Sequence, residues 1–303
     1  MQSRADGMPT VGWPPAVLAT DAALAAINVS VAARRSDDQA AAALLRKRHQ
    51  SARAACATGQ RQTISSTGGW CLGRMVSDRL FGAERLVVLP PGGPDTSYAL
   101  PGSHVEADRL IVRGIARLAG LGAARRSPSL SINDLGAGVG QYGAALRSRY
   151  AGVRWRGFDG AGDVEEYTHG RVSFVDLTLP TLALPRADWV VSLEVGEHVP
   201  RRHEMALIAN LHALNCVGVL LSWACYGGHQ HVNLRPNEWV IDTFTRLGYR
   251  YDERASAAMR NPALRTRLEA NRTHRVYGWF ARSLMVFRRW RPLTGEGCTA
   301  GVT

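Results

Sequence analysis

The chain has 303 residues, 46% of them hydrophobic, which is enough to bury a full core in one catalytic domain with an extension or in two domains. The formal net charge is +12 and is carried almost wholly by arginine, because Lys47 is the only lysine. A basic surface favours anionic partners such as nucleic acid or acidic lipid, although arginine and alanine bias is also typical of a GC-rich genome. No apolar run is long enough to cross a bilayer, so a membrane span is not expected.

The cysteines are odd in number, scattered, and without C-x-x-C spacing: Cys56, Cys71, Cys216, Cys225 and Cys298. This pattern predicts neither a disulfide framework nor a thiolate zinc site, and it favours a reducing compartment. We therefore expect a cytoplasmic protein. An organelle transit peptide is the alternative, because residues 1–35 are poor in acid and end in Arg34 and Arg35.

Residues 1–60 are expected to form a peripheral extension that contains an alanine-rich helix over 37–57. The basic cluster LLRKRH in this helix is either a solvated face, which we favour, or a contact for nucleic acid or membrane. Residues 61–102 are irregular and contain the loop signals GGWC and PPGGP. A long irregular segment ahead of a catalytic core is typical of a lid.

A capping box predicts the next helix, with Ser103 as N-cap and Glu106 three residues later. Ile111, Ile115 and Leu118 follow on one face of this helix, so it is expected to pack on a sheet. The segment 61–127 is therefore interpreted as a lid followed by a leading helix, ahead of a catalytic domain over 128–291 and a tail over 292–303.

Strands and helices alternate from residue 130 onward. Strands are predicted over 130–134, 153–159, 171–176, 188–193, 217–224, 249–252 and 284–290, and helices over 139–150, near Val164, over 201–214, 237–247 and 262–271. Such alternation indicates a mostly parallel sheet, and the closing pair of strands suggests an antiparallel edge. The predicted fold class is α/β, with a Rossmann-like, mostly parallel seven-stranded sheet and an antiparallel last strand, preceded by a helical and irregular N-terminal extension.

The stretch SINDLGAGVGQY, residues 131–142, combines a buried strand with a glycine turn and a helix start. Gly136, Gly138 and Gly140 have no Cβ, so the backbone can approach a ligand closely. Such a turn at the carboxyl end of a strand is where a nucleotide-like cofactor binds. Taken alone, the turn is compatible with a dinucleotide fold, a methyltransferase fold or an ordinary strand-to-helix connection.

Acids and histidines gather after the later strands, and strand ends of a parallel sheet meet at one edge. Asp159 closes the second strand and is positioned to accept both hydroxyls of a ribose, or to cap the following helix. Asp176 closes the third strand and either holds an adenine amino group or forms an Asx turn. Glu194 to His198 follow the fourth strand, and His229 to Asn233 follow the fifth.

Four motifs in fixed order, DLGAGVG, FD, VDLT and SLEVGEHVP, resemble those of class I S-adenosylmethionine-dependent methyltransferases over residues 130–291. A dinucleotide dehydrogenase fits less well, because its fingerprint is G-x-G-x-x-G. The resemblance implies S-adenosylmethionine as cofactor, with the methionine part beside Asp134 and the glycines, the ribose on Asp159, and adenine near Asp176. The cofactor-binding set that it implies is Asp134, Gly136, Ala137, Gly138, Gly140, Asp159, Asp176, Leu177 and Glu194.

The E-V-x-E-H arrangement is similar to that of two subsets of this family, the ubiquinone-pathway O-methyltransferases and the small-RNA 2′-O-methyltransferases. The resemblance implies a divalent metal on Glu194, Glu197 and His198, with His229 or His231 as a further ligand. Such a set suits manganese, iron or zinc better than magnesium. The alternative is that the loop works without metal, with Glu197, His198 and His231 as catalytic residues that orient or deprotonate the nucleophile.

Three hypotheses for function follow. The first is methyl transfer to an oxygen or nitrogen of a small molecule, enclosed by residues 61–102. The second is methylation of RNA at the 2′-hydroxyl, favoured by the basic charge. The third is a non-catalytic, regulatory protein that binds S-adenosylmethionine. Tryptophan is usually a core residue, and only Trp70 is interpreted as a substrate contact.

Overall fold

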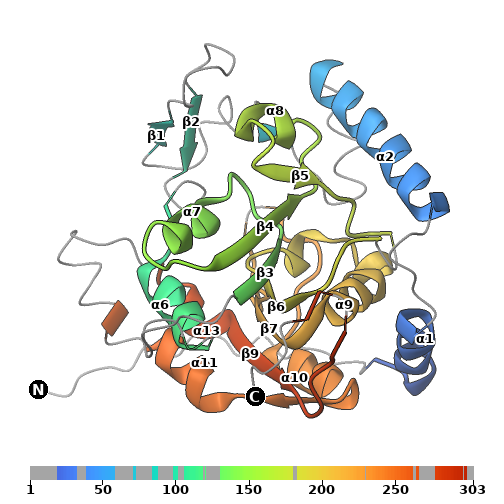
Figure 1. Ribbon diagram of the computed structural model, residues 1–303, viewed down its shortest axis with the longest axis vertical. Helices are drawn as coiled ribbons and strands as arrows, with labels where there is room; N and C mark the ends of the chain where they lie inside the picture. Colours follow the sequence, from blue (N-terminus) through green and yellow to red (C-terminus); the bar gives the residue numbers. More distant parts are fainter. Residues whose placement is uncertain are drawn as a thin grey trace, which may run out of the picture.

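The structure is a computed structural model of the whole chain (Figure 1). It describes residues 19–32, 39–58, 71–72, 84–87, 98–101, 106–118, 120, 130–179, 183–228, 230–261, 264–265, 277–295 and 297–298. The elements in chain order are α1 (Asp21–Ala32), α2 (Gln39–Thr58), β1 (Glu84–Val87), β2 (Tyr98–Pro101), α6 (Arg109–Leu118), β3 (Leu130–Leu135), α7 (Gln141–Arg147), β4 (Val153–Asp159), α8 (Val164–Thr168), β5 (Val172–Phe174), β6 (Ala187–Ser192), η1 (Gly196–His198), η2 (Arg201–His203), α9 (Glu204–Ala213), β7 (Asn215–Ser222), α10 (Asn237–Arg246), β8 (Tyr249–Tyr251), α11 (Glu253–Arg260), α13 (Phe280–Ser283) and β9 (Leu284–Arg289).

The central feature is a seven-stranded sheet in the order β5-β4-β3-β6-β7-β9-β8. Neighbouring strands from β5 to β7 are parallel, whereas β9 runs antiparallel to both β7 and β8. The predicted fold class is therefore confirmed, including the antiparallel last strand. A separate pair, β1 and β2, forms a small antiparallel sheet inside the segment that was predicted to be irregular.

Helices cover both faces of the sheet and bury two hydrophobic clusters (Figure 1). Every residue of β3, β6 and β7 is buried. In β7 no polar side chain occurs from Cys216 to Leu221, as expected for a strand covered on both faces, whereas β3 and β6 also bury polar side chains. In β6, Trp189 and Val191 belong to the cluster beneath α6 and α7, whereas Val190 belongs to the cluster beneath α9 and α10. This alternation follows from the two-residue period of a strand.

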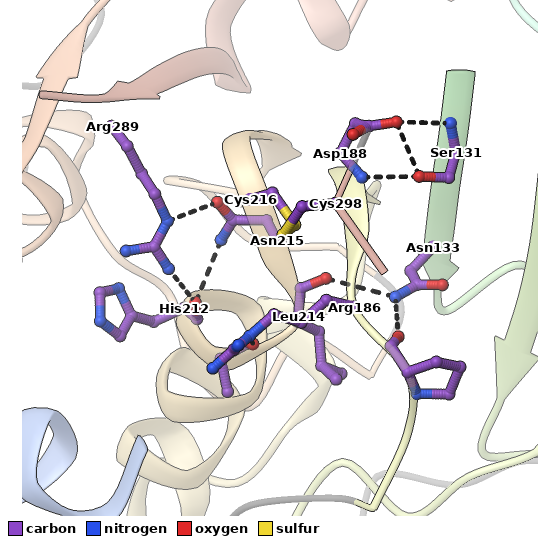
Figure 2. Close-up of a disulfide and its surroundings, with 12 residues drawn as sticks. Ser131, Asn133, Arg186, Asp188, His212, Leu214, Asn215, Cys216, Arg289 and Cys298 are labelled. Carbon is purple, nitrogen blue, oxygen red and sulfur yellow. Dashed lines mark hydrogen bonds between the residues drawn. A yellow bond between two sulfur atoms is a disulfide. The ribbon is translucent and has the colours of Figure 1, made fainter. Parts of the chain in front are cut away.

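Buried polar side chains link β3 to the adjoining β6 (Figure 2). Asp188 Oδ2 accepts hydrogen bonds from the backbone nitrogen and the hydroxyl of Ser131, at 2.8 and 2.7 Å. The Ser131 hydroxyl oxygen in turn accepts from the Asp188 nitrogen at 2.9 Å. At the other end of the pair, the Ser192 hydroxyl donates to the Leu135 carbonyl at 2.9 Å. These bonds define how the two central strands pair, and hence where their carboxyl ends lie.

The leading helix α6 begins at Arg109, later than the capping box predicted. Residues 106–108 are not helical, and Ser103 lies outside the described residues. The cap is instead Asp108, whose Oδ1 accepts from the backbone nitrogens of Leu110 and Ile111 at 2.9 and 3.1 Å. The same carboxylate accepts through Oδ2 from Tyr277 and from the fully buried Arg265. A tertiary ion pair therefore selected the start of this helix.

The prediction that the cysteines form no disulfides was wrong. Cys56 bonds to Cys71 and Cys216 to Cys298, which leaves Cys225 as the free thiol. Cys216 and Cys298 are separated by 82 residues, and Figure 2 shows their bond beside the polar contacts of β7. Pairing over such a separation depends on which segments meet in space, and cysteine spacing does not report that.

Near the C-terminus, β8 and β9 agree with their predicted strands to within one residue. The helix α11 was not predicted. Of the helix expected over 262–271, only residues 264–265 are described, and they are helical. Across the described segments, no helix combines the length and the apolarity that a membrane span requires.

We predict that Cys298→Ser lowers the free energy of unfolding by about 2 to 4 kcal/mol, because the disulfide limits the freedom of a long loop in the unfolded chain. Urea denaturation followed by fluorescence measures this loss. The matched control is Cys225→Ser, which removes the free thiol. Equal stability of the two variants under oxidising conditions would contradict the prediction, and added reductant should remove the difference between wild type and Cys298→Ser.

Candidate active site

The strand order reverses between β3 and β6, because β4 lies on one side of β3 and β6 on the other. In an open α/β sheet, ligands bind outside the carboxyl ends of the strands at such a point. The glycine turn follows β3, and the segment from Glu194 to His198 follows β6. The two most distinctive motifs of the sequence therefore lie on either side of the expected ligand crevice.

The glycine turn needs glycine for both conformation and space. Gly136, Gly138 and Gly140 have φ angles of 86°, 55° and 81°, in the left-handed region that side chains disfavour. A Cβ added to Gly136 would lie 2.1 Å from Cγ2 of Val195, in the loop after β6. The Gly136 and Ala137 nitrogens donate to the Phe158 carbonyl at 2.8 and 2.9 Å, which fastens the turn to β4.

Two buried or partly buried carboxylates lie next to this turn: Asp159, which is hydrogen-bonded to it, and Asp134, near the end of β3. Asp159 Oδ2 accepts from the Gly138 nitrogen at 2.8 Å, and its Oδ1 accepts from the Ala161 nitrogen at 2.9 Å. Each oxygen has a second lone pair, so these bonds leave capacity for a ribose. Asp134 accepts from the indole nitrogen of Trp155 at 3.1 Å, and burial raises the pKa of Asp134 to about 7. The ribose and methionine contacts of these two residues stay predictions.

Asp176 forms the Asx turn that was the alternative to adenine binding. Its Oδ1 accepts from the nitrogen and the hydroxyl of Thr178 at 2.9 and 2.5 Å. Its Oδ2 lies 3.7 Å from Nε of Arg48, which comes from α2. Leu177 is buried, and its carbonyl accepts from Asn210 at 3.2 Å. Adenine binding by Asp176 and Leu177 therefore stays a prediction, with Arg48 as an additional neighbour.

Helix α2 lies against the carboxyl ends of β4 and β5. The His49 ring stacks on Phe174 with centroids 4.5 Å apart and an interplanar angle of 6°. A Cβ on Gly162 would lie 2.4 Å from the backbone of Ala52. Cys56 of α2 forms a disulfide with Cys71. The backbone nitrogen of the next residue, Leu72, donates to Asp163 at 2.8 Å. The helix is thus anchored beside the expected adenosine side of the crevice.

Three residues in the loops after β6 and β7 could hold a metal ion. Glu197, His198 and His231 each offer a ligand atom, and these atoms all lie within 4.8 Å of one another. Nδ1 of His198 lies 3.2 Å from the Gln230 carbonyl, and Nδ1 of His231 lies 3.1 Å from the Tyr226 carbonyl. A carbonyl only accepts, so both Nδ1 atoms are assigned as donors and the lone pair is on Nε2. This is the usual arrangement of histidine ligands, which donate their second nitrogen to a carbonyl.

The Glu197 carboxylate is the least satisfied polar group of the site. The residue is fully buried, and neither oxygen accepts a hydrogen bond of ordinary geometry within the described part of the chain. Burial raises its pKa well above the usual range, and the nearby Glu194 carboxylate raises it further. A buried carboxylate requires a partner, which a cation or a proton supplies. A metal-ligand role of Glu197 beside two imidazoles fits this requirement.

Glu194, the other predicted ligand, is held by hydroxyl groups. Its Oε1 accepts from Ser222 at 2.7 Å and from Ser283 at 3.5 Å, and its nitrogen donates to the Ser222 hydroxyl at 2.7 Å. Its backbone is strained, with a φ of 56°. Burial raises the pKa of Glu194, while the hydrogen bond from Ser222 and the nearby His231 ring lower it. Its roles toward cofactor and metal stay predictions.

The loop after β7 is folded tightly around His231. A Cβ on Gly228 would lie 2.4 Å from Cε1 of the His231 ring, so this glycine lets the imidazole turn back over the loop. The His231 ring also meets the His198 ring edge to face, with centroids 5.1 Å apart. His229, the other candidate ligand, and Trp70, the candidate substrate contact, lie outside the described residues.

Sequence reasoning missed the supports behind this loop. Asn233, the last residue of the group His229 to Asn233 that follows the fifth predicted strand, is buried and donates to Glu204 at 3.2 Å. Arg235 is likewise buried and is paired with the same carboxylate. The only signal for this pairing was an arginine beside apolar residues. Trp223 and Trp239 pack edge to face in the core, as expected for tryptophan.

No protein-family model and no curated protein matches the chain. Among solved structures, it is similar to the magnesium protoporphyrin IX methyltransferase (ChlM) of Synechocystis PCC 6803 with bound S-adenosylmethionine, at 18% identity over 58% of this chain and 78% of that chain, with a TM-score of 0.40. It is also similar to a TehB-like S-adenosylmethionine-dependent methyltransferase of Corynebacterium glutamicum, at 18% identity over 58% of this chain and 86% of that chain, with a TM-score of 0.39. A third similar structure is the small RNA methyltransferase HEN1, at 13% identity over 61% of this chain and 26% of that chain, with a TM-score of 0.40. Likeness at these values concerns the fold alone.

We predict that Gly136→Ala destabilises the protein more than Gly170→Ala. Both glycines have positive φ angles, but a Cβ at Gly170 meets nothing within 4 Å, whereas one at Gly136 overlaps Val195. Backbone strain of roughly 1 to 2 kcal/mol is common to both variants, so the difference reports the overlap. Urea denaturation gives the two free energies of unfolding. Adding Val195→Ala should recover part of the Gly136→Ala loss, and no recovery would contradict the assigned contact.

Proposed function

We propose that this protein is an S-adenosylmethionine-dependent O-methyltransferase that uses a divalent cation to bind its acceptor hydroxyl. The observation that carries the proposal is the buried Glu197 carboxylate, whose oxygens accept no hydrogen bond of ordinary geometry among the described residues and which lies beside His198 and His231. The glycine turn and Asp159 lie across the same crevice and provide the cofactor side. Both halves of a transfer site thus meet at one switch point.

The protein's own task in such a reaction is modest, because a sulfonium is already a good methyl donor. The glycine turn and Asp159 bind the cofactor and fix the methyl group in line with the acceptor oxygen. That oxygen forms a bond to the methyl carbon, the carbon–sulfur bond breaks, and the hydroxyl proton passes to a base. Glu197, His198 and His231 would hold the cation, which when bound polarises the hydroxyl and eases loss of its proton.

The donor set indicates which cation fits. Two imidazole nitrogens and one carboxylate suit manganese, iron or zinc, whereas magnesium prefers oxygen ligands. Glu194 lies near enough to Glu197 to raise its pKa, so it adds negative charge next to the three ligands. A shared proton or a cation would relieve the repulsion between these two carboxylates, and the adjacent imidazole nitrogens of His198 and His231 favour the cation.

We predict that Glu197→Gln and His231→Ala each weaken Mn²⁺ binding by at least about tenfold, because each removes one of three ligands. Calorimetry or electron paramagnetic resonance of Mn²⁺ measures the affinity. Glu238→Gln, an exposed carboxylate on α10, is the matched control and should bind Mn²⁺ as the wild type does. Wild-type protein without affinity for Mn²⁺, Fe²⁺ or Zn²⁺ would refute the cation-dependent part of the proposal.

We predict that Asp159→Ala weakens S-adenosylmethionine binding by about 1 to 3 kcal/mol, because it removes a charged acceptor and frees the Gly138 nitrogen. Calorimetric titration with the cofactor measures this change. Asp242→Ala, on the far helix α10, serves as the control. Unchanged affinity in Asp159→Ala would exclude the ribose assignment. A wild-type protein that does not bind S-adenosylmethionine would contradict both methyltransferase hypotheses.

A nucleic-acid acceptor is the second candidate, and one observation favours it over a neutral small molecule. Exposed cationic side chains lie near His203, whose pKa is lowered first by its burial and then by Arg202 and Arg48, whereas Asp176 raises it. Arg46, Lys47 and Arg53 of α2 are exposed on the same helix as Arg48. Steep salt dependence of RNA affinity would support this acceptor, and absence of RNA binding at low salt would eliminate it.

The acceptor is identified by a transfer assay with cofactor labelled in the methyl group. Metabolite and RNA extracts are incubated with wild-type protein, with Glu197→Gln, and with wild-type protein after treatment with a chelator. Label that enters a small molecule or RNA only with untreated wild type supports cation-dependent methyl transfer. Cofactor binding with no labelled product in either extract favours the third hypothesis, a regulatory protein that binds S-adenosylmethionine.

A further inference from the structure

Behind the loop that carries His231 lies a buried ion pair outside the ligand set. Glu204 is the first residue of α9, and Arg235 precedes α10. Nε of Arg235 donates to Glu204 Oε2 at 2.8 Å, and a second guanidinium nitrogen donates to Oε1. The side chains are only 5% and 10% exposed. Replacing such a pair by apolar residues is often neutral for stability, so stability alone is a weak reason for its presence.

The same carboxylate also holds the loop through Asn233. Nδ2 of Asn233 donates to Glu204 Oε2 at 3.2 Å, and the Asn233 carbonyl accepts from the indole nitrogen of Trp223 at 2.7 Å. The Arg235 guanidinium lies 4.1 Å from the ring centroid of Trp239, and the backbone nitrogen of Arg235 donates to the Ala224 carbonyl at 3.2 Å. The segment from His231 to Arg235, named here the His231 segment, is therefore fixed by side chains from three separate elements.

The fixed segment is in direct contact with the candidate ligands. The backbone nitrogens of Val232 and Asn233 donate to the Glu197 carbonyl at 2.8 and 2.9 Å. Asn233 thus bonds through its side chain to Glu204 and through its backbone to Glu197. His231 immediately precedes these two residues, so a shift of the segment changes the distance between the His231 imidazole and the Glu197 carboxylate.

We propose that Glu204 and Arg235 are positioning residues that hold the His231 segment against Glu197 and so set the geometry of the Glu197–His198–His231 cluster. The significance of this geometry for catalysis rests on the proposed function. The positioning itself is a property of the fold and is measured without any cation. The ion pair acts at a distance from the reacting atoms, and neither residue is a catalytic residue.

The decisive variant is the double replacement Glu204→Leu/Arg235→Met, which substitutes apolar side chains of similar size for the pair. We expect its melting temperature to stay within about 4 °C of the wild type. Hydrogen exchange at the amides of Val232 and Asn233 should accelerate by at least about tenfold, because the segment opens locally. The control is Arg288→Met on β9. It breaks the ion pair in which Arg288 Nε lies 2.8 Å from the carboxylate of Asp252, the N-cap residue of α11.

A second readout distinguishes positioning from a general effect on folding. Co²⁺ or Mn²⁺ affinity of the double variant should fall about tenfold to hundredfold, the usual effect of losing an outer support of metal ligands. The absorption spectrum of bound Co²⁺ should change with it, and Arg288→Met should retain both properties. S-adenosylmethionine affinity should be unchanged, because the glycine turn and Asp159 do not contact the pair.

Asn233→Ala keeps the ion pair of Arg235 with Glu204 and removes only the second link of the segment to Glu204, the side-chain hydrogen bond of Asn233, so it tests the positioning by Glu204 even if the double variant folds poorly. Accelerated exchange at Val232 in this variant supports the proposal. Wild-type exchange rates at Val232 in both folded variants would overturn it, as would equal acceleration in Arg288→Met. Wild-type protein that binds neither Co²⁺ nor Mn²⁺ would defeat the cation-dependent function, while the exchange rates still decide the positioning role.

Discussion

The candidate site depends on one backbone acceptor, the carbonyl oxygen of Glu197. It receives hydrogen bonds from Val232 and Asn233, and it thereby joins the loop after β6 to the loop after β7. Both loops leave parallel neighbouring strands, so their starting points are set by the sheet. The joint brings the His231 imidazole to the buried Glu197 carboxyl group, whose oxygens accept no hydrogen bond of ordinary geometry among the described residues.

The sheet places the two halves of the site at its switch point. The turn after β3 has the space and the strained glycine backbone that close approach of a cofactor requires, and the segment after β6 has the carboxylates and imidazole. The turn after β3 and the loop after β6 are also in contact, because a Cβ at Gly136 would overlap the side chain of Val195. A change on the cofactor side can therefore reach the loop that carries Glu197.

The N-terminal helices belong to the fold more closely than the composition of residues 1–60 suggested. Leu24 and Ile27 of α1 lie in the core cluster beneath α9 and α10, and α2 is held by a disulfide at Cys56. Disulfides persist mainly in oxidising compartments, so the cysteine pattern no longer supports a reducing one. The cytoplasmic localisation and the domain boundaries stay predictions.

The alternation of strands and helices in the sequence determined the fold class, because buried strands and amphipathic helices have distinct periods that are local in the chain. The glycine turn and the acids at strand ends were equally local, so the sheet edge at which a ligand site is expected could be named from the sequence. What only the tertiary structure decided was pairing: Cys216 with Cys298, Asp108 with Arg265, and Arg235 with Glu204. These partners are distant in sequence, and the backbone path that brings them together leaves no periodic signal. The same reason applies to Glu197 and His231, whose residue types suggested a metal site while their distance came from the fold.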